Sequence, residues 1–331
     1  MGIVKDVLYK ASNKNLLSVF KNQSIFPYYH LVRDNQVPHI THLYPYKNSK
    51  QFLADLDLLS ANYKSLHPKD LLENKKSGNT FLLTFDDGLH EIYSVIFPIL
   101  KEKKINAVFF INPNFVENNE GLYKHYISII ITHLDKSNYD SDSLLKISKV
   151  FNFTFNNVNE FKKNFIGIPY SQREKVKEVL TLLNLDIHSY LKNEQPYITK
   201  KQIQEMIDAG FYFGGHTMNH PPLHQLSHQE QKKEIIDSVD WLRQNFNIDY
   251  SFFAFPFSDK AVSKTLLQEL FTYDKDIILF GNSGLKKDID SRIIQRFSLE
   301  NPTKNTAKQI VTENLYKYFN KLIGKYNIQR K

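Results

Sequence analysis

The chain has 331 residues, of which 41% are hydrophobic, so it is long enough to bury a sizeable core in one or two domains. It contains no cysteine, which excludes disulfides and thiolate ligands and leaves histidine and carboxylate side chains as the only ligands for a metal ion. The net charge of +8 would suit a phosphorylated sugar carrier or an anionic membrane face, but no nucleic-acid-binding motif accompanies it, so we expect no nucleic-acid partner.

The first 24 residues contain no apolar run longer than residues 16–20. A signal peptide core or a membrane span needs a longer run. We therefore expect a cytoplasmic protein that contacts the cytoplasmic membrane face peripherally at most.

Predicted strands and helices alternate along most of the chain. Short runs of apolar and aromatic residues predict strands at 26–32, 80–83, 105–111, 211–215, 252–255, 277–280 and 293–297. Helical spacing of apolar residues predicts helices at 49–63, 68–72, 92–103, 199–209, 227–245 and 305–326. The order of strand, helix and strand favours an α/β fold with a parallel sheet and crossover helices.

The region from about residue 118 to residue 195 has a different character. It is rich in lysine and asparagine and has helical segments, including 122–134 and 172–183, without a strong strand signal. We expect a single domain over residues 1–331 in which about 118–195 form a helical insertion. Such an insertion could cover the site or contact a partner, or it could have only a packing role.

Two adjacent aspartates, Asp86 and Asp87, follow the strand predicted at 80–83. They belong to the sequence TFDDG, in which Gly88 ends the apolar pattern. Catalytic groups collect at the C-terminal ends of strands in α/β folds, and neighbouring strand residues point to opposite sides, so the two carboxylates can have different roles. Taken alone, the motif could also be an acidic turn.

Two histidines, His216 and His220, follow the strand predicted at 211–215. On a helical turn this spacing puts both imidazoles on one face, where they could share a divalent ion, although such a pair also occurs by chance on protein surfaces. Two histidines and one carboxylate would leave a coordination position open for water, whose pKa a metal lowers toward ~7. A second carboxylate beside this site could take the proton.

Three motifs in this order resemble those of the polysaccharide deacetylases of the NodB-homology type, carbohydrate esterase family 4. They are TFDDG at 84–88, HTMNH at 216–220 and FAFPF at 253–257. The resemblance implies a distorted (β/α)7 barrel and a divalent metal, usually zinc. It also implies that Asp86 is the general base, that Asp87, His216 and His220 are the metal ligands, and that the backbone N–H of Phe257 helps to hold the oxyanion.

The sequence departs from the family pattern at two places. Ala254 stands where the family has an arginine that orients the catalytic aspartate, and no histidine follows His228 to serve as the usual general acid. A branch that includes the poly-N-acetylglucosamine deacetylases has the same alanine and takes its histidine from an N-terminal Tyr-His, which Tyr29-His30 resembles. We therefore expect His30 to be the general acid; the alternative is a strand-end histidine bonded to the backbone. The sequence does not identify a group that orients Asp86.

Other polar residues are weaker candidates for contacts with the substrate. Ser258-Asp259, the segment 281–284 and Arg296 suit hydroxyl or phosphate binding, but also ordinary turns and strand ends. The segment 237–241 copies a family motif, DxxDW, out of order, so we assign Trp241 to packing and the aspartates to a solvated helix face.

These observations predict a metal-dependent deacetylase that removes an acetyl group from an N- or O-acetylated sugar. A nucleotide-linked or lipid-linked saccharide, an intracellular precursor in surface-polysaccharide biosynthesis, is the expected substrate. A catalytically inactive carbohydrate-binding member of the same fold is the first alternative, favoured by the missing arginine. A hydrolase of a non-sugar amide is the second, because it would use the same site.

Overall fold

The computed structural model describes residues 3–73 and 78–331 of the chain. Contacts between residues divide the chain into two compact units. The barrel unit consists of Met1–Asp34, Tyr46–Pro113 and Lys200–Lys331, and the helical unit consists of Asn35–Pro45 and Asn114–Thr199.

A parallel sheet of eight strands forms the centre of the barrel unit in the described residues. Its strands are β1 (Pro27–Tyr29), β4 (Leu83–Phe85), β5 (Ala107–Ile111), β6 (Tyr212–Gly215), β7 (Phe252–Ala254), β8 (Ile278–Gly281), β9 (Ile293–Gln295) and β10 (Phe297–Ser298). The order is β10-β1-β4-β5-β6-β7-β8-β9, and every neighbouring pair is parallel. Because only Arg296 separates β9 from β10, the chain itself joins the two edges of the sheet into a nearly closed barrel. The predicted barrel fold is thereby confirmed.

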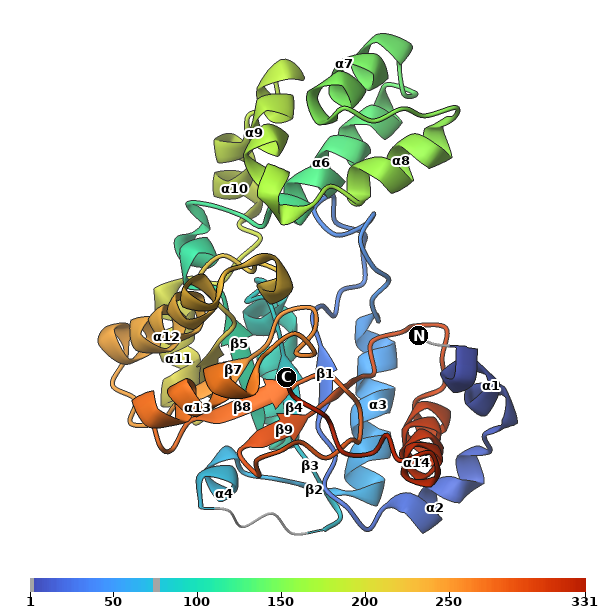
Figure 1. Cartoon of the computed structure of the whole chain (residues 1–331), viewed down its shortest axis with the longest axis vertical. Helices are drawn as coiled ribbons and strands as arrows, with labels where there is room; N and C mark the ends of the chain where they lie inside the picture. The colour runs from blue at the N-terminus through green and yellow to red at the C-terminus, as the bar shows by residue number, and fades with distance from the viewer. Residues whose placement is uncertain (1–2, 74–77) are drawn as a thin grey trace. The chain divides into compact units, whose positions relative to one another are not determined.

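Helices surround these strands (Figure 1). In the described residues they are α1 (Ile3–Ala11), α2 (Leu17–Phe20), α3 (Ser49–Asn62), α4 (Pro68–Leu72), α5 (Phe97–Lys103), α11 (Lys200–Asp208), α12 (His228–Asn245), α13 (Lys264–Tyr273) and α14 (Thr306–Leu322). The side chains of Asn48 and Ser227 cap α3 and α12, each in a capping box that satisfies N–H groups left open at a helix start. Their positions explain why the predicted starts of these two helices are correct to within a residue.

Several predicted elements differ in detail from the structure, among them the strand predicted at 26–32, of which only β1 (Pro27–Tyr29) forms. The helix predicted at 92–103 is a π-helical turn, Ile92–Ile96, followed by α5, with Pro98 in the first turn of α5 where a missing N–H costs nothing. The strand predicted at 80–83 contributes to two sheets, because β3 (Thr80–Phe81) pairs with β2 (Lys64–Ser65) and Leu83 starts β4. The strand predicted at 293–297 is interrupted at Arg296, as described above.

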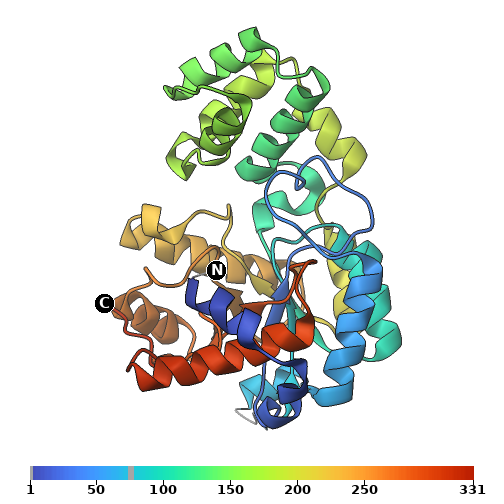
Figure 2. The ribbon, with the colours of Figure 1, turned by 90° about the vertical axis from the view of Figure 1, so that its right-hand side faces the viewer.

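The helical unit is built mainly from five α-helices in the described residues (Figure 2). They are α6 (Tyr123–Lys136), α7 (Ser141–Phe151), α8 (Val158–Ile166), α9 (Arg173–Leu182) and α10 (Ile187–Glu194). Asp140, Asn157 and Asp186 cap α7, α8 and α10 through their side chains. Ile127 on α6 and Phe161 on α8 are fully buried, so apolar packing holds these helices together.

Across the described part of the chain, no helix combines the length and the apolar character that crossing a bilayer requires.

Candidate active site

The two aspartates lie immediately after β4 and are both buried. Asp87 has a φ of 74° and Gly88 a φ of 65°, in the left-handed region that most residues avoid. A Cβ atom at Gly88 would lie 3.1 Å from the side chain of Ile111, so glycine suits both the turn and the close approach to β5. Strain of this kind persists at functional sites where the surrounding structure enforces it.

Arg296 orients Asp86. Its Nη1 lies 2.7 Å from Oδ1 of Asp86 and its Nη2 lies 2.9 Å from Oδ2, the two-pronged geometry of a strong guanidinium–carboxylate pair. Nη1 also donates to the hydroxyl of Thr84 at 2.9 Å, and Nε donates to the carbonyl of Gly281 at 3.2 Å. The Arg296 residue is fully buried. The group that orients Asp86, which the sequence leaves unidentified, therefore comes from the junction of β9 and β10.

The pKa of Asp86 reflects this contact. Burial acts to raise it, but the positive charge and the hydrogen bonds of Arg296, with a contribution from His216, outweigh burial and lower it. Asp86 is accordingly ionised at neutral pH and able to accept a proton. Arg296 does not serve as the substrate contact that the sequence suggested, because its polar atoms are used inside the barrel.

Asp87, His216 and His220 form a buried group whose ligand atoms all lie within 4.8 Å of one another. Nε2 of His220 is 3.1 Å and Nε2 of His216 is 3.5 Å from Oδ1 of Asp87. That oxygen makes no hydrogen bond in the described residues although it is buried. An unsatisfied buried carboxylate oxygen faced by two imidazole nitrogens fits the donor set of a divalent cation with an open coordination position.

His216 and His220 do not lie on a helical turn, contrary to the sequence-based expectation. They occupy the loop after β6, where Thr217 has a φ of 67° and His220 a φ of 53°. The two imidazole rings nevertheless approach to 4.9 Å between centroids. A helix is not needed to bring the two imidazoles together, because groups distant in the sequence hold the loop in place.

Three of these groups can be named. Nδ2 of Asn112 donates to the carbonyls of both His216 and Thr217. Nδ1 of His216 lies 2.7 Å from the carbonyl of Ala254, which leaves Nε2 directed at Asp87. The carboxylate of Glu234 on α12 accepts from the N–H of Met218 at 2.8 Å and from the N–H of Asn219 at 3.0 Å.

Replacement of Glu234 by alanine is expected to weaken metal binding by about 10–100-fold, the usual effect of removing a group that positions metal ligands. The two N–H groups lose their common acceptor, so the loop between the histidines relaxes. Metal titration by calorimetry measures the effect. Glu230, also on α12, bonds to Ser227 at the exposed helix start and serves as the matched control; equal loss in both variants would contradict the role given to Glu234.

His30 follows β1 and is held by Glu300. Oε2 of Glu300 accepts from the N–H of His30 at 3.0 Å and lies 2.9 Å from its Nδ1. The pairing of β1 with β4 places His30 next to Asp86, whose N–H donates to the carbonyl of Tyr29 at 3.0 Å. Burial lowers the pKa of His30, but the negative charges of Glu300 and Asp87 outweigh burial and raise it to about 10. In this setting His30 carries a proton at neutral pH.

Phe257 occupies the turn after β7 with a φ of 54°. Within the described residues its N–H makes no hydrogen bond, and its ring lies 4.6 Å from the ring of His220 between centroids. The ring of Phe257 therefore lies beside the metal-ligand group. Nδ2 of Asn282 donates to the carbonyl of Phe257 and supports the turn from β8.

The remaining sequence candidates lie outside this arrangement. His228, the last histidine of the chain, lies 3.1 Å from Glu269. Asp237 forms an exposed pair with Lys233 on α12, which agrees with a solvated helix face. Asp259 is buried and bonded to Gln295 at 2.8 Å, so its role is in the support of the turn rather than in direct contact with a ligand.

A family model described as "Polysaccharide deacetylase" matches residues 73–129 and 147–274, more than half of the chain. The chain belongs to the polysaccharide deacetylase family. The resemblance inferred from the three motifs is thereby confirmed. No curated relative matches the sequence.

Solved structures have a similar fold. The deacetylase PplD of Streptococcus pyogenes, solved in complex with acetate, is 18% identical, with 88% of this chain and 98% of that chain covered at a TM-score of 0.55. IcaB of Ammonifex degensii is 15% identical, with 88% and 97% covered at 0.53. A de-N-acetylase of Aggregatibacter actinomycetemcomitans is 16% identical, with 87% and 100% covered at 0.51.

Proposed function

We propose that this deacetylase uses a divalent metal ion, zinc, to remove an acetyl group from an acetylated saccharide. The observation that carries the proposal is the pairing, in one buried site, of an ionised aspartate held by Arg296 with the Asp87–His216–His220 group. Two adjacent carboxylates in different electrostatic surroundings are what separate roles for base and ligand require.

The residues can be given roles from their geometry. A bound divalent ion would supply a Lewis acid that lowers the pKa of a water molecule and polarises the acetyl carbonyl. Asp86 takes the proton of the attacking water as the new C–O bond forms. The N–H of Phe257 donates to the oxygen that becomes negative. His30, protonated and held by Glu300, gives its proton to the leaving amine or hydroxyl as the bond to the acetyl carbon breaks.

Finer features of the substrate and its compartment are part of the same proposal. We propose a nucleotide-linked or lipid-linked saccharide of a surface-polysaccharide pathway, handled in the cytoplasm with at most peripheral membrane contact, by one deacetylase domain with a helical insertion at about 118–195. A chain with a net charge of +8 and no cysteine suits an anionic carrier and has no need of an oxidising compartment. Tyr29-His30 and Ala254 of this chain resemble the motif pattern of the poly-N-acetylglucosamine deacetylase branch. This resemblance supports an N-acetylated sugar as the substrate.

Removal and return of the metal provide the test. After chelation, acetate release from N-acetylglucosamine oligomers or from nucleotide-linked N-acetylglucosamine is expected to fall to background, and about one equivalent of zinc per chain should restore it, because the group offers three ligands for a single ion. Zinc binding without acetate release from any saccharide would favour the inactive carbohydrate-binding alternative. Release from acetylated amino acids but not from sugars would favour the non-sugar amide.

A further inference from the structure

A second buried charge cluster lies beside the active site and includes none of the proposed catalytic groups or metal ligands. Arg330 is its cation, and its side chain is 1% exposed. Nη2 of Arg330 lies 2.7 Å from Oδ2 of Asp259 and 2.5 Å from Oδ2 of Asp288, whose side chains are 1% and 0% exposed. Two buried carboxylates therefore depend on one guanidinium for their counter-charge.

The cluster is connected to the turn that carries Phe257. Asp259 comes two residues after Phe257, and Arg330 donates both to its carboxylate and, through Nη1, to its backbone carbonyl. A guanidinium that bonds the backbone as well as the side chain fixes the position of the chain at that point. The N–H proposed to hold the oxyanion is thus two residues from a fixed point.

The cluster is also connected to the strand that carries Arg296. Nε2 of Gln295 donates to Oδ2 of Asp259 at 2.8 Å and to Oδ2 of Asp288 at 2.7 Å, and Oε1 of Gln295 accepts from the N–H of Ser283 at 2.7 Å. Gln295 is the residue directly before Arg296. Arg330 therefore supports, through Asp259 and through Gln295, both the oxyanion donor and the group that orients Asp86.

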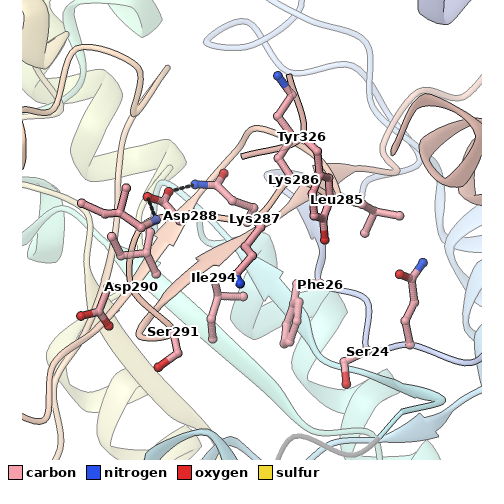
Figure 3. A pocket seen from close by; sticks show the side chains of 14 residues that line it. Ser24, Phe26, Leu285, Lys286, Lys287, Asp288, Asp290, Ser291, Ile294 and Tyr326 are labelled. Atoms are coloured by element: carbon pink, nitrogen blue, oxygen red, sulfur yellow. Dashed lines mark hydrogen bonds between the residues drawn. The ribbon is translucent and has the colours of Figure 1, made fainter. Parts of the chain in front are cut away.

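Packing alone does not hold this region. The segment that includes Asp288 borders a cavity of about 470 Å³, which Lys287, Ile294 and Tyr326 also line (Figure 3). On this side the segment is held by the hydrogen bonds of Asp288 and by backbone bonds of Lys287 to Tyr326 and Ile328. Burial acts to raise the pKa of Asp259, but the charge of Arg330 and the bond from Gln295 outweigh it and lower that pKa, so Asp259 and Arg330 form an ion pair at neutral pH.

We propose that Arg330 is a positioning residue of the deacetylase site, acting on the turn of Phe257 through Asp259 and on Arg296 through Gln295. This role rests on the proposed function for its effect on turnover. It makes a separate prediction about the backbone of residues 255–260, which holds whether or not a substrate is known.

The test compares Arg330→Gln with Arg292→Gln. Arg292 is a matched control because it lies in the same β8–β9 region, pairs with Asp290 at 2.7 Å and is 32% exposed. In Arg330→Gln, kcat should fall by about 10–100-fold while KM stays within about threefold, since misplaced groups lose transition-state contacts rather than substrate binding. Zinc affinity should be unchanged, and amide hydrogen exchange at 255–260 should become faster. Arg330→Lys, which keeps the positive charge but not the forked guanidinium donors, should recover part of kcat.

Several outcomes would overturn the proposal. Wild-type kcat in folded Arg330→Gln, or a loss of zinc affinity parallel to the loss of kcat, would show that Arg330 does not act by positioning these groups. If Arg330→Gln does not fold, the double variant Asp288→Asn/Arg330→Gln, which removes one carboxylate with the cation, replaces it with the same expected results. If the wild-type protein releases no acetate, the proposed function fails, and unchanged exchange at 255–260 would then overturn the role of Arg330 separately.

Discussion

Replacement of Arg296 by methionine is expected to lower kcat/KM by about 10²–10³-fold and to destabilise the protein by about 3–5 kcal/mol, the cost of leaving a buried charge without its partner. Methionine fills much of the same space among apolar neighbours but offers no hydrogen-bond donor. Asp86 then loses both bonds that fix its carboxylate and the charge that keeps it ionised.

The pH dependence of the Arg296→Met variant gives a sharper test than the loss of activity. In the wild-type protein the lowered pKa of Asp86 contributes stability that is present above the unfolded pKa of about 3.9 and is lost as the pH falls through the folded pKa. Without Arg296, burial dominates and raises that pKa, so the carboxylate destabilises the variant increasingly as the pH rises. The acidic limb of the pH–rate profile should move to higher pH.

Rate profiles and thermal unfolding at pH 5 and pH 8 measure both effects. Arg243→Met is the control, because Arg243 pairs with Asp274 on the barrel unit with its side chain 33% exposed. A profile for Arg296→Met with an unshifted acidic limb would contradict the view that Arg296 sets the protonation state of Asp86.

The paired variants Asp86→Asn and Asp87→Asn should both lose activity but should differ in metal binding. Both carboxylates are buried, adjacent and replaced by the same nearly isosteric amide. Asp86→Asn should bind zinc with unchanged affinity and lose about 10²–10⁴-fold in kcat, the usual contribution of a general base. Asp87→Asn should lose zinc, because a neutral amide oxygen replaces the ligand that faces both imidazoles.

Calorimetric zinc titration and acetate release separate these effects. Turnover at the wild-type rate in Asp86→Asn would exclude Asp86 as the base. Loss of zinc from both variants alike would mean that the two carboxylates share the ligand role, and the distinction drawn from their surroundings would be wrong.

The residues in local motifs could be predicted from the sequence, whereas the orienting role of Arg296, named there only as a weaker candidate for substrate contact, and the role of Glu300 could not. Asp86, Asp87, His216 and His220 end predicted strands, and their chemistry is visible in short segments. Arg296 and Glu300 contact partners 210 and 270 residues away, and no local pattern encodes such a distance. One signal was available: an arginine inside the apolar run at 293–297 is costly to bury unless it is paired.

At the loop 216–220 the sequence identified the residues, but the predicted local structure was wrong. The spacing of four residues between the histidines suits a helix, but the spacing alone does not report where the backbone N–H groups bond. Here Glu234 and Asn112, which lie on other elements, form hydrogen bonds with backbone groups of the loop. These bonds offset the conformational cost of the left-handed backbone at Thr217 and His220. Tertiary contacts therefore decide the local structure.

The single residue that joins β9 to β10 separates two sources of support for the site. The metal-ligand group comes from the ends of β4 and β6, which are linked through β5. The groups that hold Asp86 and His30 come from residues 296–300, where the last strands close the ring. A change confined to this closing segment should therefore release the base and the acid while the three metal ligands keep their own supports.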